Sequence, residues 1–308
     1  GVPFCLHVSL PKPHQCYTPA QEFWDLYDED ALHLPPNADT EDPHEAPHLK
    51  KARAGWAGNE WTLFEPHTFE AGRLRKLHGY LGNISHVDYA VGELMQWLDD
   101  NQLADNTIVI YSSDHGDYAA EHGIMEKAPG ICHDAITRIP FIWRWPGHFQ
   151  AGHTVTELVE SVDVATTLPA LCGLPPLETA DGHNIEHLLR GKHGKVRNVA
   201  VTEFAWSKSV RKDKWRLVWY PKAMFADEYP DGFGQLYNLK NDPWEQRNLF
   251  FDPEYHGVVE ELQADLVDWL VTTTRPGTTH GPAVPASTQT VSRYKHTMNV
   301  DGKINRAR

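Results

Sequence analysis

The sequence predicts an α/β fold with a mainly parallel sheet flanked by helices, followed by a small antiparallel α+β subdomain. Three observations support this prediction. Residues 74–98 carry apolar side chains at helical spacing, and the apolar β-branched run Thr107–Tyr111 follows them. After residue 195 the pattern changes to alternating segments rich in Trp and Tyr. Helical spacing before a buried strand is typical of α/β units, and strict alternation is typical of antiparallel strands.

The elements of the first part follow in order. Residues 3–10 read as a strand, and the period that begins at Leu74 predicts one helix with an apolar stripe. The order strand, loop, helix, strand forms a βαβ unit, so the strands at 3–10 and 107–111 are expected to lie parallel. Residues 139–143 read as a third strand. Asp163 is expected to cap a helix at 164–171.

The second part begins where the period changes. Residues 199–204, 209–220 and 234–239 read as antiparallel strands, covered by a helix at about 255–271. We therefore expect an α/β domain over 1–195, an antiparallel subdomain over 196–271 and an extended tail over 272–308.

Composition limits the classes of function. The chain has 308 residues, 41% of them hydrophobic, which is enough for a large core. A formal net charge of −14 argues against a nucleic-acid partner, because such proteins need a basic face. No apolar run approaches the roughly 20 residues of a membrane-spanning helix, so no span is predicted.

The polar residues after the 107–111 strand are the first candidates for chemistry. Asp114, His115 and Gly116 stand just beyond the strand, and Lys127 lies on the loop that follows. Ligands of open α/β sheets bind beyond the carboxyl ends of the strands. Asp and neutral His can share a divalent cation, and a lysine ammonium suits sulfate or phosphate. The pattern predicts a site for a metal and an anionic substrate.

Six segments, in order, carry a resemblance to a known family. They are Pro3–Pro19 with the Pro13-His14 loop, Tyr80–Leu98, Asp114–Lys127, Arg138–Phe141, Asp163–Leu168 and Leu236–Leu249. Together they resemble the sulfatases of the alkaline-phosphatase superfamily, over almost the whole chain up to about residue 270. The resemblance implies a sulfuric ester hydrolase.

The resemblance also implies roles for single residues. Asp114 would be a ligand of one Ca²⁺ ion, and His115 would be a second ligand or a proton donor beside the metal. His14 and Lys127 would be catalytic and would bind the substrate sulfate, His14 as a proton donor and Lys127 as a cation beside the leaving oxygen. The substrate would be a small-molecule or carbohydrate sulfate ester, and the compartment periplasmic, secreted or lysosomal.

Supporting roles are expected for three more residues. His122 is expected to be structural, holding the loop that positions Lys127. Asp134 and Arg138 are expected to form a structural pair behind the site.

One departure from the family pattern concerns the nucleophile. Sulfatases use a Cys-x-(Pro/Ala/Ser)-x-Arg motif whose cysteine becomes formylglycine, and none of Cys5, Cys16, Cys132 and Cys172 has that context. The paired N-terminal aspartates of the family metal site are missing as well. A truncated sulfatase, inactive by itself, is the favoured interpretation. A phosphodiesterase or phosphonate monoester hydrolase, or a non-catalytic binding module, are the alternatives.

Overall fold

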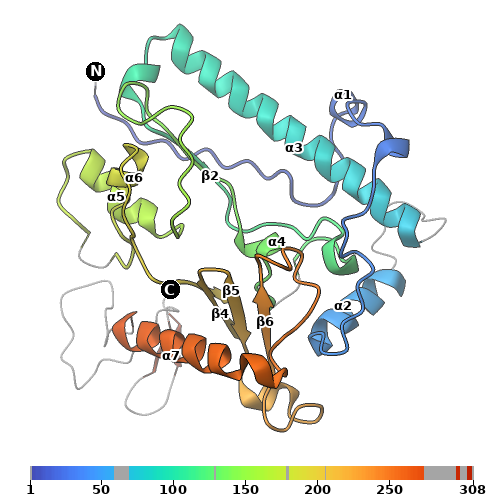
Figure 1. The fold of residues 1–308 in the computed structure, drawn as a ribbon. Helices are drawn as coiled ribbons and strands as arrows, with labels where there is room; N and C mark the ends of the chain where they lie inside the picture. The colour runs from blue at the N-terminus through green and yellow to red at the C-terminus, as the bar shows by residue number, and fades with distance from the viewer. Residues whose placement is uncertain are drawn as a thin grey trace.

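The computed structural model describes residues 2–58, 69–127, 130–177, 180–204 and 206–273, and the backbone of 296–298 and 304–306. Within these ranges, residues 54–58 and 69–71 are described by their backbone alone. Figure 1 shows the long helix α3 on one side of the molecule and the strands β4, β5 and β6 with α7 on the other. The short helix α4 lies between them.

The first part is mainly helical. Its elements are α1 (Gln21–Trp24), η1 (Glu29–Ala31), α2 (Pro47–Gly58) and α3 (Phe69–Asp100). The predicted helix at 74–98 is confirmed within α3. Gly79 lets the Pro-His loop approach α3 closely, because a Cβ there would lie 2.1 Å from Tyr17 O. Gly82 does the same for Pro19. The loop that carries His14 therefore rests directly on α3.

The strand prediction for this part is partly wrong. β1 (Val109–Ser112) and β2 (Phe141–Arg144) form a two-stranded sheet, but they run antiparallel, with Val109 opposite Arg144. Residues 2–10 pair with neither of them, and Phe4 and Leu6 are 61% and 71% exposed. A parallel neighbour needs a crossover connection. Between β1 and β2 the described chain has only single helical turns, so the chain simply reverses.

Short helices complete the first part. They are η2 (Ala104–Asn106), η3 (Glu121–Gly123), α4 (Asp134–Thr137), α5 (Asp163–Leu171) and α6 (Glu186–Leu189). The helix expected after Asp163 is present, but Asp163 is its first residue and not its cap. Its buried carboxylate instead accepts from the backbone of Glu160 and His183 and pairs with Arg197. The carboxylate thus holds the chain entering the helix and neutralises the buried Arg197 guanidinium.

The second part is an antiparallel sheet. β3 (Ala200–Phe204), β4 (Ser207–Lys212), β5 (Trp215–Trp219) and β6 (Gly234–Asn238) follow in that spatial order. η4 (Lys222–Phe225), η5 (Pro253–Tyr255) and α7 (His256–Thr273) complete it. The strand expected at 209–220 is a hairpin, which turns at Asp213 with φ 48°. An Asp tolerates this left-handed backbone better than most residues, so no Gly marked the turn.

Two apolar clusters hold the sheet. One packs α7 on the strands, with Val210, Leu217, Leu236, Leu262 and Leu266 buried. The other joins the sheet to the segment between β1 and β2: its buried members include Tyr118, Ile124, Ile131, Ile136, Val218 and Phe233. The loop after β1 is thus packed against the second sheet.

The predicted tail at 272–308 lies mostly outside the described residues. Within it, β7 (His296–Met298) and β8 (Ile304–Arg306) form an antiparallel pair. Of the helices in the described ranges, none is long and apolar enough to cross a membrane.

Candidate functional site

The end of β1 presents two open ligand atoms. Asp114 Oδ2 and His115 Nε2 lie 3.5 Å apart. His115 Nδ1 is hydrogen-bonded to Gly116 O at 2.7 Å, which leaves Nε2 facing the carboxylate. Asp114 Oδ1 accepts from the His115 backbone at 3.0 Å. The motif that follows the strand therefore folds back so that both side chains point to one place.

The charge of Asp114 suits a cation. Partial burial opposes ionisation, but the neighbouring His115 and the hydrogen bonds from His115 N and Ser113 hold the pKa of Asp114 below its ordinary value. An ionised carboxylate oxygen and an imidazole nitrogen with a free lone pair fit a divalent ion. Two such ligands fill only part of a Ca²⁺ sphere, which takes six to eight oxygens.

Asp117 organises the loop after this pair. Its Oδ1 accepts from the backbone N–H groups of Ala119 and Glu126, both at 2.8 Å. Its Oδ2 accepts from the Tyr17 hydroxyl at 2.8 Å, which ties the loop to the segment that carries His14. Each hydrogen bond to an ionised group contributes about 1.5–3 kcal/mol. One carboxylate thus closes the loop and joins it to a segment a hundred residues away.

The loop backbone is strained. Ala119, Ala120, His122 and Glu126 all have φ between 46° and 76°, in the region that favours glycine. Such conformations cost about 1–3 kcal/mol each and cluster at functional sites, where surrounding contacts hold them. The contacts of Asp117 perform that task here, and the strained run ends one residue before Lys127.

His14 and Lys127 approach the same carboxylate. Burial and the nearby Asp117 raise the pKa of Glu126, and the positive charges of Lys127, His14 and Lys76 act in the opposite direction. His14 is exposed, and its Nδ1 is hydrogen-bonded to Gln15 O at 2.9 Å, so its Nε2 is open to solvent. Lys127 is half-buried. Lys127, His14 and Lys76 come from three segments, and each is near enough to Glu126 to act on its pKa.

The site residues form two groups. Asp114 and His115 follow β1, whereas His14 and Lys127 both act electrostatically on Glu126. The chain from Asp114 through Asp117 connects the groups, but no hydrogen bond or ion pair within the described ranges joins them directly. Their catalytic roles stay predictions.

A buried polar cluster lies behind the loop. Ligand atoms of His122, His133 and Glu245 lie within 4.8 Å of one another, and the two imidazole rings stack at 4.3 Å. Burial lowers the pKa of His122 to about 3 and raises that of Glu245 to about 8. The guanidinium groups of Arg53 and Arg216 contact His122 O and Glu245, and their charge opposes a cation. We interpret this cluster as a structural network.

Glu245 gives stability a measurable pH dependence. Its pKa is raised on folding, so its contribution is full below pH 4.5 and is lost as pH rises towards 8. The Glu245→Gln variant has no such proton. We expect its free energy of unfolding, relative to the unsubstituted protein, to rise between about pH 5 and pH 8. Urea titrations across that range measure the difference, and a difference that does not vary with pH would contradict the assignment.

The supporting residues differ in part from expectation. His122 is buried and carries the carbonyl that Arg53 contacts, in agreement with a structural role. Asp134 pairs with Arg216 of the second sheet, while Arg138 is exposed, so the expected Asp134–Arg138 pair is wrong. Arg216, the partner of Asp134, lies 82 residues away in the sequence, so no local sequence pattern indicates the pair. Asp117 and Glu126 were also missed as site residues.

Comparison with known proteins adds the family context. A family model described as sulfatase matches residues 1–174. A second, described as the C-terminal part of N-sulphoglucosamine sulphohydrolase, matches residues 120–271. A choline-sulfatase of Rhizobium meliloti (strain 1021) is 29% identical over 263 residues, covering 82% of this chain and 47% of the relative. An arylsulfatase of Clostridium perfringens is 24% identical over 277 residues, covering 87% and 53%.

Solved structures show the same fold. A protein in complex with its substrate D-glucosamine-2-N,6-O-disulfate matches with a TM-score of 0.72 at 19% identity, covering 85% of this chain and 64% of that one. A phosphonate monoester hydrolase of Agrobacterium radiobacter matches with a TM-score of 0.68 at 18% identity, covering 96% and 59%. The chain spans about half the length of the curated relatives it matches, for example 47% of the choline-sulfatase.

Proposed function

The chain belongs to the sulfatase family, and from that premise we propose that it supplies part of a site that hydrolyses sulfate esters. Asp114 and His115 would bind the metal, and Lys127 and His14 would bind the sulfate group of a small-molecule or carbohydrate ester. The observation that carries this proposal is the pair of open ligand atoms, 3.5 Å apart, at the end of β1. The loop that follows, held by Asp117, carries Lys127, and both Lys127 and His14 act on the pKa of Glu126.

Each of these residues has a definite task. A Ca²⁺ ion held by Asp114 and His115 would supply positive charge next to the sulfate oxygens. Lys127 would place its ammonium group against the same oxygens, where a point charge stabilises the charge that develops. His14 presents Nε2 to solvent and would hold the proton that the leaving oxygen needs.

The nucleophile of the family has no counterpart in this chain. None of the cysteines stands in a Cys-x-(Pro/Ala/Ser)-x-Arg context, so formylglycine does not fit any residue here and no nucleophilic step is assigned. We propose that sequence beyond these 308 residues supplies the nucleophile and the remaining metal ligands. The same sequence would add strands beside residues 2–10 and β1, giving the mainly parallel sheet of a domain over 1–195. Residues 196–271 would form the second subdomain.

Phosphonate ester hydrolysis is the second candidate, because the fold also matches a phosphonate monoester hydrolase. The two activities are separated by assaying the chain together with the additional sequence proposed above, hereafter the extended protein. We expect a higher kcat/KM for 4-nitrophenyl sulfate than for 4-nitrophenyl phenylphosphonate. Turnover of the phosphonate alone would replace the sulfatase proposal with the second one.

A further inference from the structure

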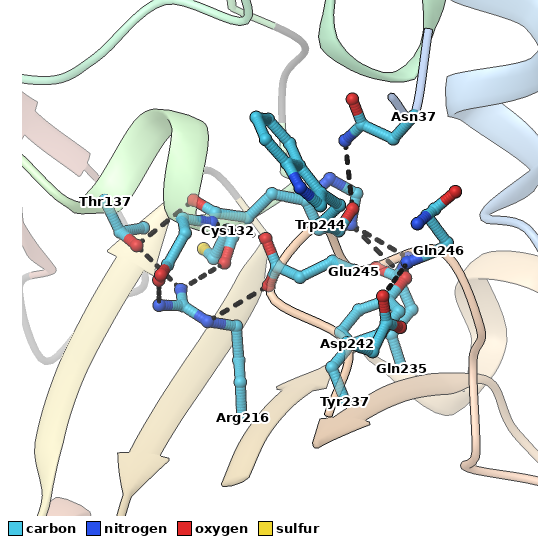
Figure 2. A network of polar contacts seen from close by, with 12 residues as sticks. Asn37, Cys132, Thr137, Arg216, Gln235, Tyr237, Asp242, Trp244, Glu245 and Gln246 are labelled. Carbon is cyan, nitrogen blue, oxygen red and sulfur yellow. Dashed lines mark hydrogen bonds and ion pairs between the residues drawn. The ribbon is translucent and has the colours of Figure 1, made fainter. Parts of the chain in front are cut away.

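Arg216 reaches from the second sheet into the segment behind the candidate site. Its side chain is 5% exposed, and Figure 2 shows it surrounded by acceptors. One terminal nitrogen donates to Cys132 O and to Thr137 Oγ1, both at 2.6 Å. The other pairs with the Asp134 carboxylate. A single guanidinium therefore holds both ends of α4.

Glu245 completes this anchor from the segment after β6. Its Oε2 accepts from the Asp134 backbone at 2.6 Å, at the first residue of α4. Its Oε1 lies 3.2 Å from Arg216 Nε. The backbone of Glu245 has φ 52°, an unfavourable conformation for this residue. Arg216 and Glu245 of this anchor are therefore buried, and the anchor holds Glu245 in a strained backbone conformation.

The helix α4 in turn fixes the metal-facing motif. Gly116 N donates to Ile136 O at 2.8 Å. A Cβ on Gly116 would lie 1.9 Å from Ala135 O, so the two backbones are in direct contact and only glycine fits. Gly116 O is hydrogen-bonded to Nδ1 of the His115 ring. Two hydrogen bonds at Gly116 thus connect α4 to the His115 ring.

The segment after β6 is also connected to the loop that ends at Lys127. Asn37 Nδ2 donates to Trp244 O at 2.9 Å and to Glu121 Oε2 at 3.1 Å. Glu121 opens η3, in the loop that ends at Lys127. Figure 2 shows Asn37 reaching towards Trp244, next to Glu245. The segment after β6 is consequently linked to both the metal-facing motif and the Lys127 loop.

We propose that Arg216 and Glu245 are positioning residues of the sulfate-ester site, which act through α4 and Gly116 on the Asp114–His115 pair. The inference rests on the proposed function for its chemistry, but the mechanical link is a property of the fold. It gives the second sheet a part in catalysis although none of its residues reaches the site. Small displacements of catalytic groups can cost about 100-fold in rate, so such a link matters.

A matched pair of arginines allows a sharp test. Arg216→Lys keeps the charge but loses the planar fork that bridges Cys132, Thr137 and Asp134. Arg197 provides the control: its side chain is also 5% exposed, and it pairs with Asp163 and Glu160. Those contacts join α5 to the segment before β3 and do not touch α4. Both substitutions should therefore lower the melting temperature, whereas only Arg216→Lys should disturb the site.

Three quantities are measured on the extended protein with each substitution: kcat, the Ca²⁺ concentration for half-maximal activity, and hydrogen exchange at the Gly116 amide. In Arg216→Lys we expect kcat to fall, and the Ca²⁺ concentration for half-maximal activity to rise, each by about 10- to 100-fold. In Arg197→Lys we expect both within about twofold of the unsubstituted protein. Hydrogen exchange at the Gly116 amide gives a readout that needs no activity. Its protection should fall at least about tenfold in Arg216→Lys, beyond the change in Arg197→Lys.

The outcomes distinguish a failure of the inferred link from a failure of the proposed function. Unchanged kinetics and unchanged Gly116 exchange in a folded Arg216→Lys protein would overturn the inference, as would equal effects of the two substitutions. An extended protein without sulfatase activity but with selective loss of Gly116 protection would refute the proposed function and keep the link. If Arg216→Lys does not fold, Thr137→Val removes one acceptor and should still weaken Gly116 protection. Unaltered protection in Thr137→Val would then overturn the inference.

Discussion

The 308-residue chain produced by itself is expected to release no sulfate from 4-nitrophenyl sulfate above the uncatalysed rate. The nucleophile motif is absent from the chain. A substrate-binding site without its nucleophile loses most of the rate enhancement. Ca²⁺ binding should be weak as well, because Asp114 and His115 provide two ligands where the ion takes six or more. The comparison is made with the extended protein, co-expressed with a formylglycine-generating enzyme.

The same preparation should aggregate. Val2, Phe4 and Leu6 are 90%, 61% and 71% exposed, and residues 2–10 pair with no described strand. Unpaired extended segments with apolar side chains are templates for association. Light scattering of the short and extended proteins at equal concentration tests this.

Turnover by the short chain at a rate near that of the extended protein would refute the need for additional sequence.

Replacing Lys127 by alanine in the extended protein is expected to lower kcat/KM for 4-nitrophenyl sulfate by about 10²–10³-fold. Loss of one preorganised donor to a developing charge has an effect of this size. The fold should survive, because Lys127 is only half-buried and Asp117 holds the loop through the backbone of Glu126. Steady-state kinetics and thermal unfolding together measure both parts of the prediction.

Lys222→Ala serves as the control for this experiment. Lys222 is an exposed lysine on η4, outside the site, and its loss removes one positive charge in the same way. Its kinetics should match those of the unsubstituted protein. If Lys222→Ala and Lys127→Ala had equal effects, a general change of charge would explain the loss, and the specific role of Lys127 would be wrong.

Periodicity and motif order were sufficient for much of the fold. The apolar spacing from Leu74 onwards predicted α3, and the β-branched run ending at Tyr111 predicted β1. Alternating aromatic segments predicted the second sheet, and the helix expected at about 255–271 is present as α7. These signals are local, because each depends on which face of one element is buried.

Pairings between distant segments were not predictable in the same way. The sense of β1 against β2 depends on how the connecting chain turns, and no local pattern fixes it. The partner of Asp134 is a residue of another sheet, so the nearby Arg138 was the natural but wrong choice. Asp117 was visible in the motif, yet its role follows only from the backbone groups that the folded loop brings to it.

The most direct test of the central claim is sulfate release by the extended protein with and without the Asp114→Ala substitution, each titrated with Ca²⁺. Asp114 supplies the ionised oxygen of the pair that faces the proposed ion. We predict Ca²⁺-dependent release of inorganic sulfate by the unsubstituted protein. We also predict a loss of at least about 10²-fold in Asp114→Ala at every Ca²⁺ concentration, with the fold retained. Sulfate release that is independent of both Ca²⁺ and Asp114 would contradict the assignment of the site to the end of β1.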